Sequence, residues 1–269
     1  MLSIPMMKGG LSMDEPILEV RNLSISYGNF EAVKHISFSL HPGHALAIVG
    51  KSGCGKSTIL KAIMHILQEG GRITEGDILF RGKSLKTMSD GEWQSMTGRK
   101  IALIFQQPGS YIARNLKIGV QFRDFLLTHG VKESEWEELA LKRLSEAGLP
   151  DGRRVLDSYV FQLSGGMQQK TASAMALAFK PPLILMDEPT SALDTVSSLV
   201  LLNRARKLLS GGTSIIFVTH NLNAAAYLAD RLLIMEDGRM IEEGKAEEIQ
   251  KNPRHAFTRE LLDSLLTLR

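Results

Sequence analysis

Four short runs of the chain are apolar at almost every position. They are Ala45 to Val49, Ile101 to Phe105, Leu183 to Met186 and Ser214 to Val218. Strands that are buried on both faces have this composition, whereas strands with one face in water alternate between apolar and polar residues. The pattern therefore predicts a core sheet of buried parallel strands.

A second kind of pattern, strand-like alternation, occupies the regions on either side of the first apolar run. Ile17 to Leu23 and Ala32 to Leu40 alternate around a turn at 27–29, and 76–81 (GDILFR) continues the pattern. We expect an antiparallel sheet beside the core. Residues 231–244 are expected to form a hairpin, because Asp-Gly at 237–238 is a strong turn signal.

Between Gln106 and Ser164 the pattern changes to a helical one. Ser134 followed by Glu137 resembles a capping box that would start a helix over Trp136 to Glu146, with Gly148 as its stop. Five residues of this helix share one face and are expected to pack against a core: Trp136, Leu139, Ala140, Leu144 and Ala147. A further helix is expected around 223–229.

Composition bounds the class of protein. The chain has 269 residues, is 43% hydrophobic and carries a formal net charge of +3. One α/β domain with an inserted subdomain is the natural expectation for this size. The basic residues are scattered and form no stripe that would follow a nucleic acid, so we expect no nucleic-acid partner. A single cysteine, Cys54, excludes a disulfide within the chain.

We expect no membrane-spanning segment, because no apolar run approaches the ~18 to 20 residues that a bilayer requires. Residues 1–13 lack the charged start and long apolar centre of a signal peptide. They contain four methionines, and Met13 is a candidate alternative start. We therefore expect 1–13 to be a flexible extension.

The segment directly after the first apolar run, GKSGCGKST, combines a strand, a glycine loop and the start of an amphipathic stretch that ends near Leu67. This is the P-loop pattern, in which backbone N–H groups and a helix N-terminus surround a polyphosphate. Lys56 supplies a point charge and Ser57 a hydroxyl for Mg²⁺. The predicted nucleotide-binding residues are Gly50, Lys51, Ser52, Gly53, Cys54, Gly55, Lys56, Ser57 and Thr58.

A P-loop alone does not separate kinases, GTPases, helicases and transport ATPases. Three later features separate these classes. They are LSGGMQQK at 163–170, PLILMDEPTSALD at 182–194, and His220 after the last apolar run. In this order and spacing they resemble the ATP-binding-cassette (ABC) ATPases, from Leu18 to about Gly244. The resemblance implies an α/β fold: a P-loop NTPase (RecA-like) core with an antiparallel β subdomain and an inserted α-helical subdomain. We expect the ATPase domain at 14–250, the helical subdomain at about 110–165 and a helical tail at 251–269.

The resemblance also assigns catalytic roles. Asp187, at the end of an apolar run, would reach Mg²⁺, and the adjacent Glu188 would be the general base or water-orienting group. Gln106 would sense Mg²⁺ and the attacking water, and His220 would contact the γ-phosphate. Tyr27 resembles the aromatic residue that stacks on adenine. The metal ligands implied are Ser57, Gln106 and Asp187, and the cofactors are ATP and Mg²⁺.

A second set of residues would act on the ATP of a partner. Ser164, Gly165 and Gly166 open another helix, with Ser164 as its cap, and free N–H groups there attract a terminal phosphate. In the family this phosphate belongs to the opposite cassette, and the Asp194 segment lies across the interface. The expected unit is therefore a pair of ATPases, either two copies or a heterodimer with a second homologous subunit.

Two details of the sequence point to one branch of the family. Met167 stands in the signature, as in the ATPases of oligopeptide, dipeptide and nickel importers, and the tail Asn252 to Leu262 resembles the ending of that branch. Some relatives extend the tail with cysteines that hold an iron–sulfur cluster, which we do not expect here. Lys170 departs from the arginine that is usual at its position.

The resemblance implies a peripheral subunit on the cytoplasmic face of the membrane, with two integral-membrane permeases and an extracytoplasmic substrate-binding protein as partners. The cargo, a peptide, nickel or another metal chelate, stays open. A cassette ATPase of a soluble enzyme complex such as carbon–phosphorus lyase is the alternative. A DNA-repair cassette is disfavoured, because no long coiled-coil insertion separates the P-loop from the signature. A small-molecule kinase would not need LSGGM.

Overall fold

The computed structural model describes residues 15–105, 111–191 and 194–266, and it contains two β-sheets. The smaller sheet is antiparallel, with strand order β2-β1-β4-β5. Its strands are β1 (Leu18–Tyr27), β2 (Phe30–Leu40), β4 (Gly71–Phe80) and β5 (Lys83–Ser84). The predicted antiparallel sheet is confirmed.

The larger sheet has strand order β10-β9-β3-β8-β7-β6. Its strands are β3 (Ala45–Gly50), β6 (Ile101–Ile104), β7 (Leu183–Asp187), β8 (Ser214–Thr219), β9 (Arg231–Glu236) and β10 (Arg239–Lys245). The four strands predicted from the apolar runs are parallel neighbours, as expected. The 231–244 hairpin forms as predicted, and its strand β9 extends the core sheet by pairing in parallel with β3, which the sequence did not indicate.

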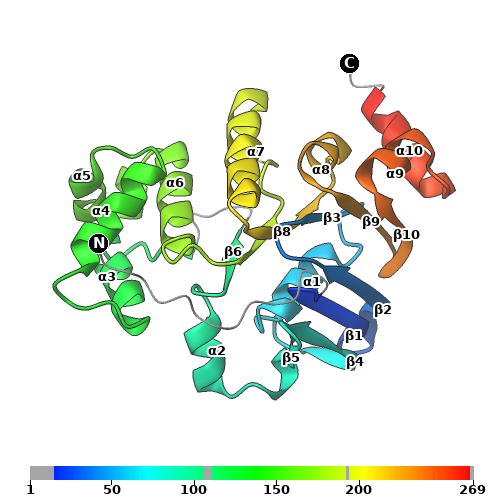
Figure 1. Cartoon of the computed structure of the whole chain (residues 1–269), viewed down its shortest axis with the longest axis horizontal. Coiled ribbons are helices and arrows are strands. Elements are labelled where there is room, and N and C mark those ends of the chain that lie inside the picture. Colours follow the sequence, from blue (N-terminus) through cyan, green and yellow to red (C-terminus); the bar gives the residue numbers. More distant parts are fainter. Residues whose placement is uncertain (1–14, 106–110, 192–193, 267–269) are drawn as a thin grey trace.

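Helices connect and cover these sheets. They are α1 (Lys56–Ile63), α2 (Asp90–Met96), α3 (Ile118–Thr128), α4 (Trp136–Glu146), α5 (Gly152–Asp157), α6 (Gly165–Ala176), α7 (Thr195–Ser210), α8 (Leu222–Leu228), α9 (Ala246–Lys251) and α10 (Ala256–Leu266), with short 3₁₀ turns at Leu85–Thr87 and Val160–Gln162. In Figure 1, α3 to α6 form a separate group to the left of the sheets, while α1 lies between the two sheets.

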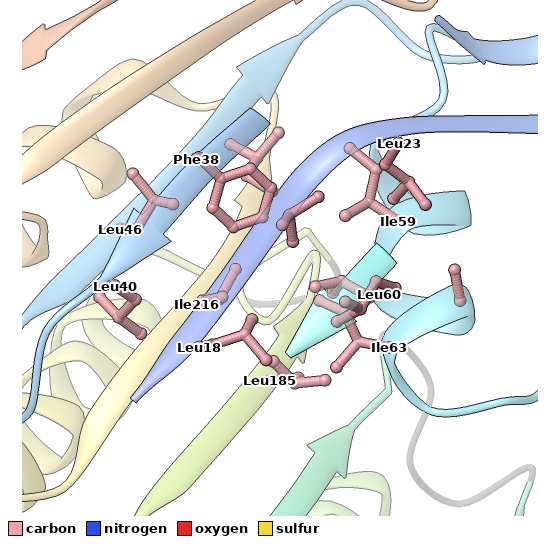
Figure 2. Close-up of a cluster of buried hydrophobic side chains, with 14 of the residues drawn as sticks. Leu18, Leu23, Phe38, Leu40, Leu46, Ile59, Leu60, Ile63, Leu185 and Ile216 are labelled. Carbon is pink, nitrogen blue, oxygen red and sulfur yellow. The ribbon is translucent and has the colours of Figure 1, made fainter. Parts of the chain in front are cut away.

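One hydrophobic core fills the space between the two sheets. Leu18 of the antiparallel sheet, Leu185 and Ile216 of the core sheet, and Ile59 and Leu60 of α1 converge there (Figure 2). All five side chains are fully buried. Burial of apolar side chains on this scale fixes α1, and with it the loop that precedes α1, between the sheets.

The opposite face of the core sheet carries a second core. Alternate residues of each parallel strand point to opposite faces, so Leu46 and Ile48 of β3 face the first core while Ala45, Ala47 and Val49 face the second. Helices α7, α8, α9 and α10 cover this second face. Apolar residues on both sides explain why these strands read as continuous runs in the sequence.

A third core belongs to the helical group alone. Phe122 of α3, Leu144 of α4, Val155 of α5 and Ala174 of α6 are buried together. The predicted apolar face of α4 packs into this core, since Ala140 and Leu144 are fully buried and the other three residues are partly buried.

Two local expectations were wrong. The N-cap of α4 is Glu135, with no side-chain hydrogen bond, so the Ser134–Glu137 capping box does not form. Helix α1 ends at Ile63 instead of near Leu67, because His65 adopts a left-handed conformation with φ of 54° and the chain turns away there.

Candidate nucleotide site

The P-loop joins the end of β3 to the start of α1, and its glycines are required by close packing. A Cβ atom on Gly50 would lie 2.3 Å from the carbonyl oxygen of Met235, and one on Gly55 would lie 2.3 Å from that of Ala32. Gly55 also has φ of 99°, which side chains disfavour. The neighbouring strands β9 and β2 therefore hold the loop by direct backbone contact.

Lys56, the first residue of α1, lies inside this loop. Lys56 is only 4% exposed, and its Nζ donates hydrogen bonds to the carbonyl oxygens of Gly50 and Lys51, both at 2.8 Å. A buried ammonium needs such partners. The arrangement places one cation among backbone groups at the N-terminus of a helix, which is the chemistry that binds a polyphosphate.

Ser57 and Asp187 meet beside the loop. The Ser57 hydroxyl donates to Asp187 Oδ1 at 2.7 Å, although the two residues come from α1 and from the end of β7. A hydroxyl and a carboxylate next to a phosphate site are the oxygen ligands that Mg²⁺ accepts, with water and phosphate completing the coordination. The residues present therefore fit the predicted ion.

Glu188, the next residue, turns to a different partner. Its carboxylate Oε2 lies 2.6 Å from Nδ1 of His220, and its side chain is only 13% exposed. Glu188 has φ of 47°. Its N–H donates a hydrogen bond to the carbonyl of Val218, and its own carbonyl accepts hydrogen bonds from Ser191. The sequence did not single out Ser191, which lies within PLILMDEPTSALD at 182–194 and orients this turn.

The remaining P-loop residues surround this centre. Lys51, Ser52 and Gly53 are exposed, and Thr58 is half-buried in α1. Cys54 is 7% exposed, and burial raises the pKa of its thiol against the opposing effect of Lys56. A thiol that stays protonated at neutral pH is a small apolar filler more than a nucleophile.

Tyr27 ends β1 and packs against the backbone of Gly71, where a Cβ atom would lie 2.6 Å from the tyrosine ring. Gln106 lies outside the described residues.

The signature residues do not join this centre. Ser164 caps α6 by accepting from the N–H of Met167, and a Cβ on Gly165 or Gly166 would meet no atom within 4 Å. In Figure 1, α6 belongs to the helical group on the left, well apart from the loop between β3 and α1. Asp194 caps α7 through the N–H and hydroxyl of Ser197.

Comparison with known proteins agrees with this geometry. The family model described as "ABC transporter" matches residues 33–191. The dipeptide transport ATP-binding protein DppD of Lactococcus lactis subsp. cremoris is 37% identical over 262 residues, which cover 95% of this chain and 75% of that protein. The oligopeptide transport ATP-binding protein OppD of Bacillus subtilis is 38% identical over 94% of this chain and 72% of that protein.

Solved structures show the same fold. The ATP-binding cassette MJ0796, a dimer in a post-hydrolysis state with ADP and Pi, matches with a TM-score of 0.73 and 28% identity, over 85% of this chain and 98% of that one. An ATP-binding subunit of an ABC transporter matches with a TM-score of 0.74 and 28% identity, over 93% and 99% of the two chains. With the P-loop, the strand-end carboxylates and the signature helix in place, the chain belongs to the ABC transporter family and is one of its ATP-hydrolysing cassettes.

Proposed function

We propose that this chain is the ATPase subunit of an importer that takes up peptides. Support comes from its likeness, along nearly the whole chain, to ATP-binding proteins named for dipeptide and oligopeptide transport. The cargo would not touch this subunit, so its side chains carry no selectivity for one peptide over another.

One geometric observation carries the proposed working unit. The P-loop and the signature helix belong to the same chain but lie apart, and the first turn of α6 is open to solvent. A phosphate bound in the P-loop therefore cannot meet the signature of its own chain. A second cassette, identical or homologous, would supply that signature; the related MJ0796 cassette is itself dimeric.

Within each site the residues divide the work of phosphoryl transfer to water, which needs mainly positioning and charge neutralisation. Lys56 would hold the β- and γ-phosphates. Ser57 and Asp187 would hold Mg²⁺, which neutralises phosphate charge when bound. Glu188, held by His220, would orient and deprotonate the attacking water. Gln106, Tyr27 and Asp194 would complete the site.

The coupling to transport follows from the shared site. ATP contacts both cassettes only when they are closed, so its binding shifts the population toward the closed pair and hydrolysis releases it. We expect the pair to sit on the cytoplasmic face of the membrane beneath two permease subunits, with an extracytoplasmic binding protein delivering the cargo. Among the described residues, no helix combines the length and apolar composition needed to cross a bilayer.

A direct test is purification of the tagged chain from detergent-solubilised membranes of its own organism. Two integral-membrane permeases should co-purify, and the reconstituted complex with its binding protein should accumulate labelled peptide in proteoliposomes only with ATP. Uptake of nickel but not of peptide would replace the proposed cargo and keep the ATPase role. Co-purification with a soluble multi-subunit enzyme and no permease would support the carbon–phosphorus lyase type of alternative.

A further inference from the structure

The last helix of the described chain touches the P-loop, although the two lie far apart in the sequence. Phe257 of α10 is 4% exposed and packs in the core beneath α8 and α9. The Nζ of Lys51, the second residue of the P-loop, lies over its ring, 4.9 Å from the centroid. A cation at this distance from an aromatic face is attracted by the ring quadrupole.

The start of α10 is fixed by a single carboxylate. Glu242 of β10 accepts hydrogen bonds from the N–H of Arg254 at 2.9 Å, the N–H of His255 at 3.2 Å and the hydroxyl of Thr258 at 2.6 Å. Thr258 is fully buried. These three donors lie on both sides of Phe257 in the sequence, so they set the position of its ring.

The contact between Phe257 and Lys51 is linked by a hydrogen bond to Lys56, which lies inside the P-loop. The carbonyl oxygen of Lys51 accepts a hydrogen bond from Lys56 Nζ at 2.8 Å. Phe257 is thus connected to the phosphate-binding ammonium through one residue, Lys51, whose side chain rests on the ring and whose peptide group faces Lys56.

We propose that Phe257 is a positioning residue for ATP binding: its ring holds Lys51, and thereby the entry of the P-loop, in the conformation that receives the phosphates. It does not touch the nucleotide. A loop that is ordered beforehand loses less conformational entropy when ATP binds, so the contact raises affinity for ATP. This inference rests on the ATPase reaction and is independent of the cargo.

The test uses four full-length variants of Phe257 and Lys51 and measures the Kd for ATP by titration, together with KM and kcat for hydrolysis. Phe257→Leu keeps most of the buried volume but removes the aromatic face, and Lys51→Met removes the cation but keeps an unbranched stem. Each should raise Kd and KM by about two- to fivefold, the size of an exposed cation–π contact, with kcat changed less than twofold. Phe257→Tyr should behave as the wild-type protein does.

The double variant Phe257→Leu/Lys51→Met decides whether the two residues act together. If they do, it should bind ATP no more weakly than the worse single variant, because the same contact is already lost. Multiplied effects, or wild-type affinity in Phe257→Leu, would overturn the inference. A fall in kcat that tracks a lowered melting temperature would also overturn it, as a purely structural effect.

Lys56→Ala separates this inference from the ATPase assignment. It should abolish binding, because it removes the cation at the phosphates themselves. Failure of the wild-type protein to bind ATP would remove both claims, whereas intact wild-type binding with an unaffected Phe257→Leu variant removes only the role of Phe257.

Discussion

At the scale of single residues, two consecutive carboxylates serve different partners. Asp187 lies next to Ser57, whereas Glu188 reaches His220. The left-handed backbone of Glu188 is uncommon for a side-chain-bearing residue, and such conformations gather at functional sites because the surroundings must hold them. In the proposed mechanism, the turn separates the carboxylate that would bind Mg²⁺ from the one that would accept a proton.

Replacing Glu188 with glutamine should abolish most ATP turnover, by about 10²- to 10⁴-fold, because a positioned proton-transfer group typically contributes this much. Binding of ATP should persist, since the P-loop is unchanged. Steady-state hydrolysis and ATP titration of the purified variant measure the two effects.

Glu236→Gln is the matched control, because Glu236 also ends a parallel strand of the core sheet. This control should hydrolyse ATP at nearly the wild-type rate. A Glu188→Gln protein with full turnover would show that another group activates the water.

Cys54 yields a prediction that depends on pH. A bulky thiol reagent should block nucleotide binding, and ATP should protect, because the sulfur lies within the phosphate loop. Burial raises the pKa of this thiol above the ordinary value, so the thiolate fraction at pH 7 is small and the rate of modification should keep rising above pH 9. Labelling followed by mass spectrometry at several pH values measures this, and a fully labelled protein with unchanged ATP binding would contradict it.

At the scale of elements, Ser164 at the start of the signature helix α6 has one observed role and one proposed role. Ser164 caps the helix and, in the proposed dimer, faces the γ-phosphate of the partner's ATP. Ser164→Asp should keep the cap, because aspartate is as good an N-cap as serine, but its charge should repel the phosphate. We expect an unchanged melting temperature with at least a tenfold loss of hydrolysis.

The reciprocal exchange, Asp151→Ser at the N-cap of α5, is the control in the same helical group. It should leave both stability and hydrolysis near the wild-type values. Hydrolysis by Ser164→Asp at the wild-type rate would mean that Ser164 is only a cap.

The attachment of α10 should depend on pH. Burial of Glu242 disfavours its charge, but hydrogen bonds from Thr258, Arg254 and His255 outweigh this and lower its pKa. Because the pKa of Glu242 is lower in the folded state, its ionised carboxylate stabilises the docked helix at pH values above the unfolded pKa of about 4.3. This stabilisation is lost as the pH falls through the folded-state pKa. The protection of the α10 amides against hydrogen exchange, relative to the intrinsic rate at each pH, should therefore fall below about pH 4, and Glu242→Gln should flatten this dependence. Protection that does not change between pH 6 and pH 3 would contradict the prediction.

The sequence predicted elements best where local pattern and burial agree. The runs at β3, β6, β7 and β8 were identified because both of their faces are apolar, and the P-loop because its glycines stand at fixed spacing. It failed where distant contacts decide. The pairing of β9 with β3 and the packing of Phe257 under Lys51 join segments that no local pattern connects. The capping box at Ser134 failed because a two-residue signal is weak without the geometry of the turn.

At the scale of the whole molecule, the proposed ATP site is divided between two separate parts of the cassette. The P-loop, Ser57, Asp187 and Glu188 lie together at the ends of the core strands, while the first turn of α6 presents its N–H groups elsewhere on the surface. In the proposed dimer, closed two-fold pairing would complete both halves at once. Association driven by ATP is therefore the central property that we propose for the molecule.

The most direct test of this property is the molar mass in solution of the Glu188→Gln protein, measured by light scattering with ATP and Mg²⁺. The Glu188→Gln protein is measured alone and together with its cognate second cassette. ADP in place of ATP serves as the control. We predict a mass close to that of two cassettes with ATP and of one with ADP. A protein that stays monomeric with ATP and Mg²⁺, even when the cognate cassette is present, would contradict the account.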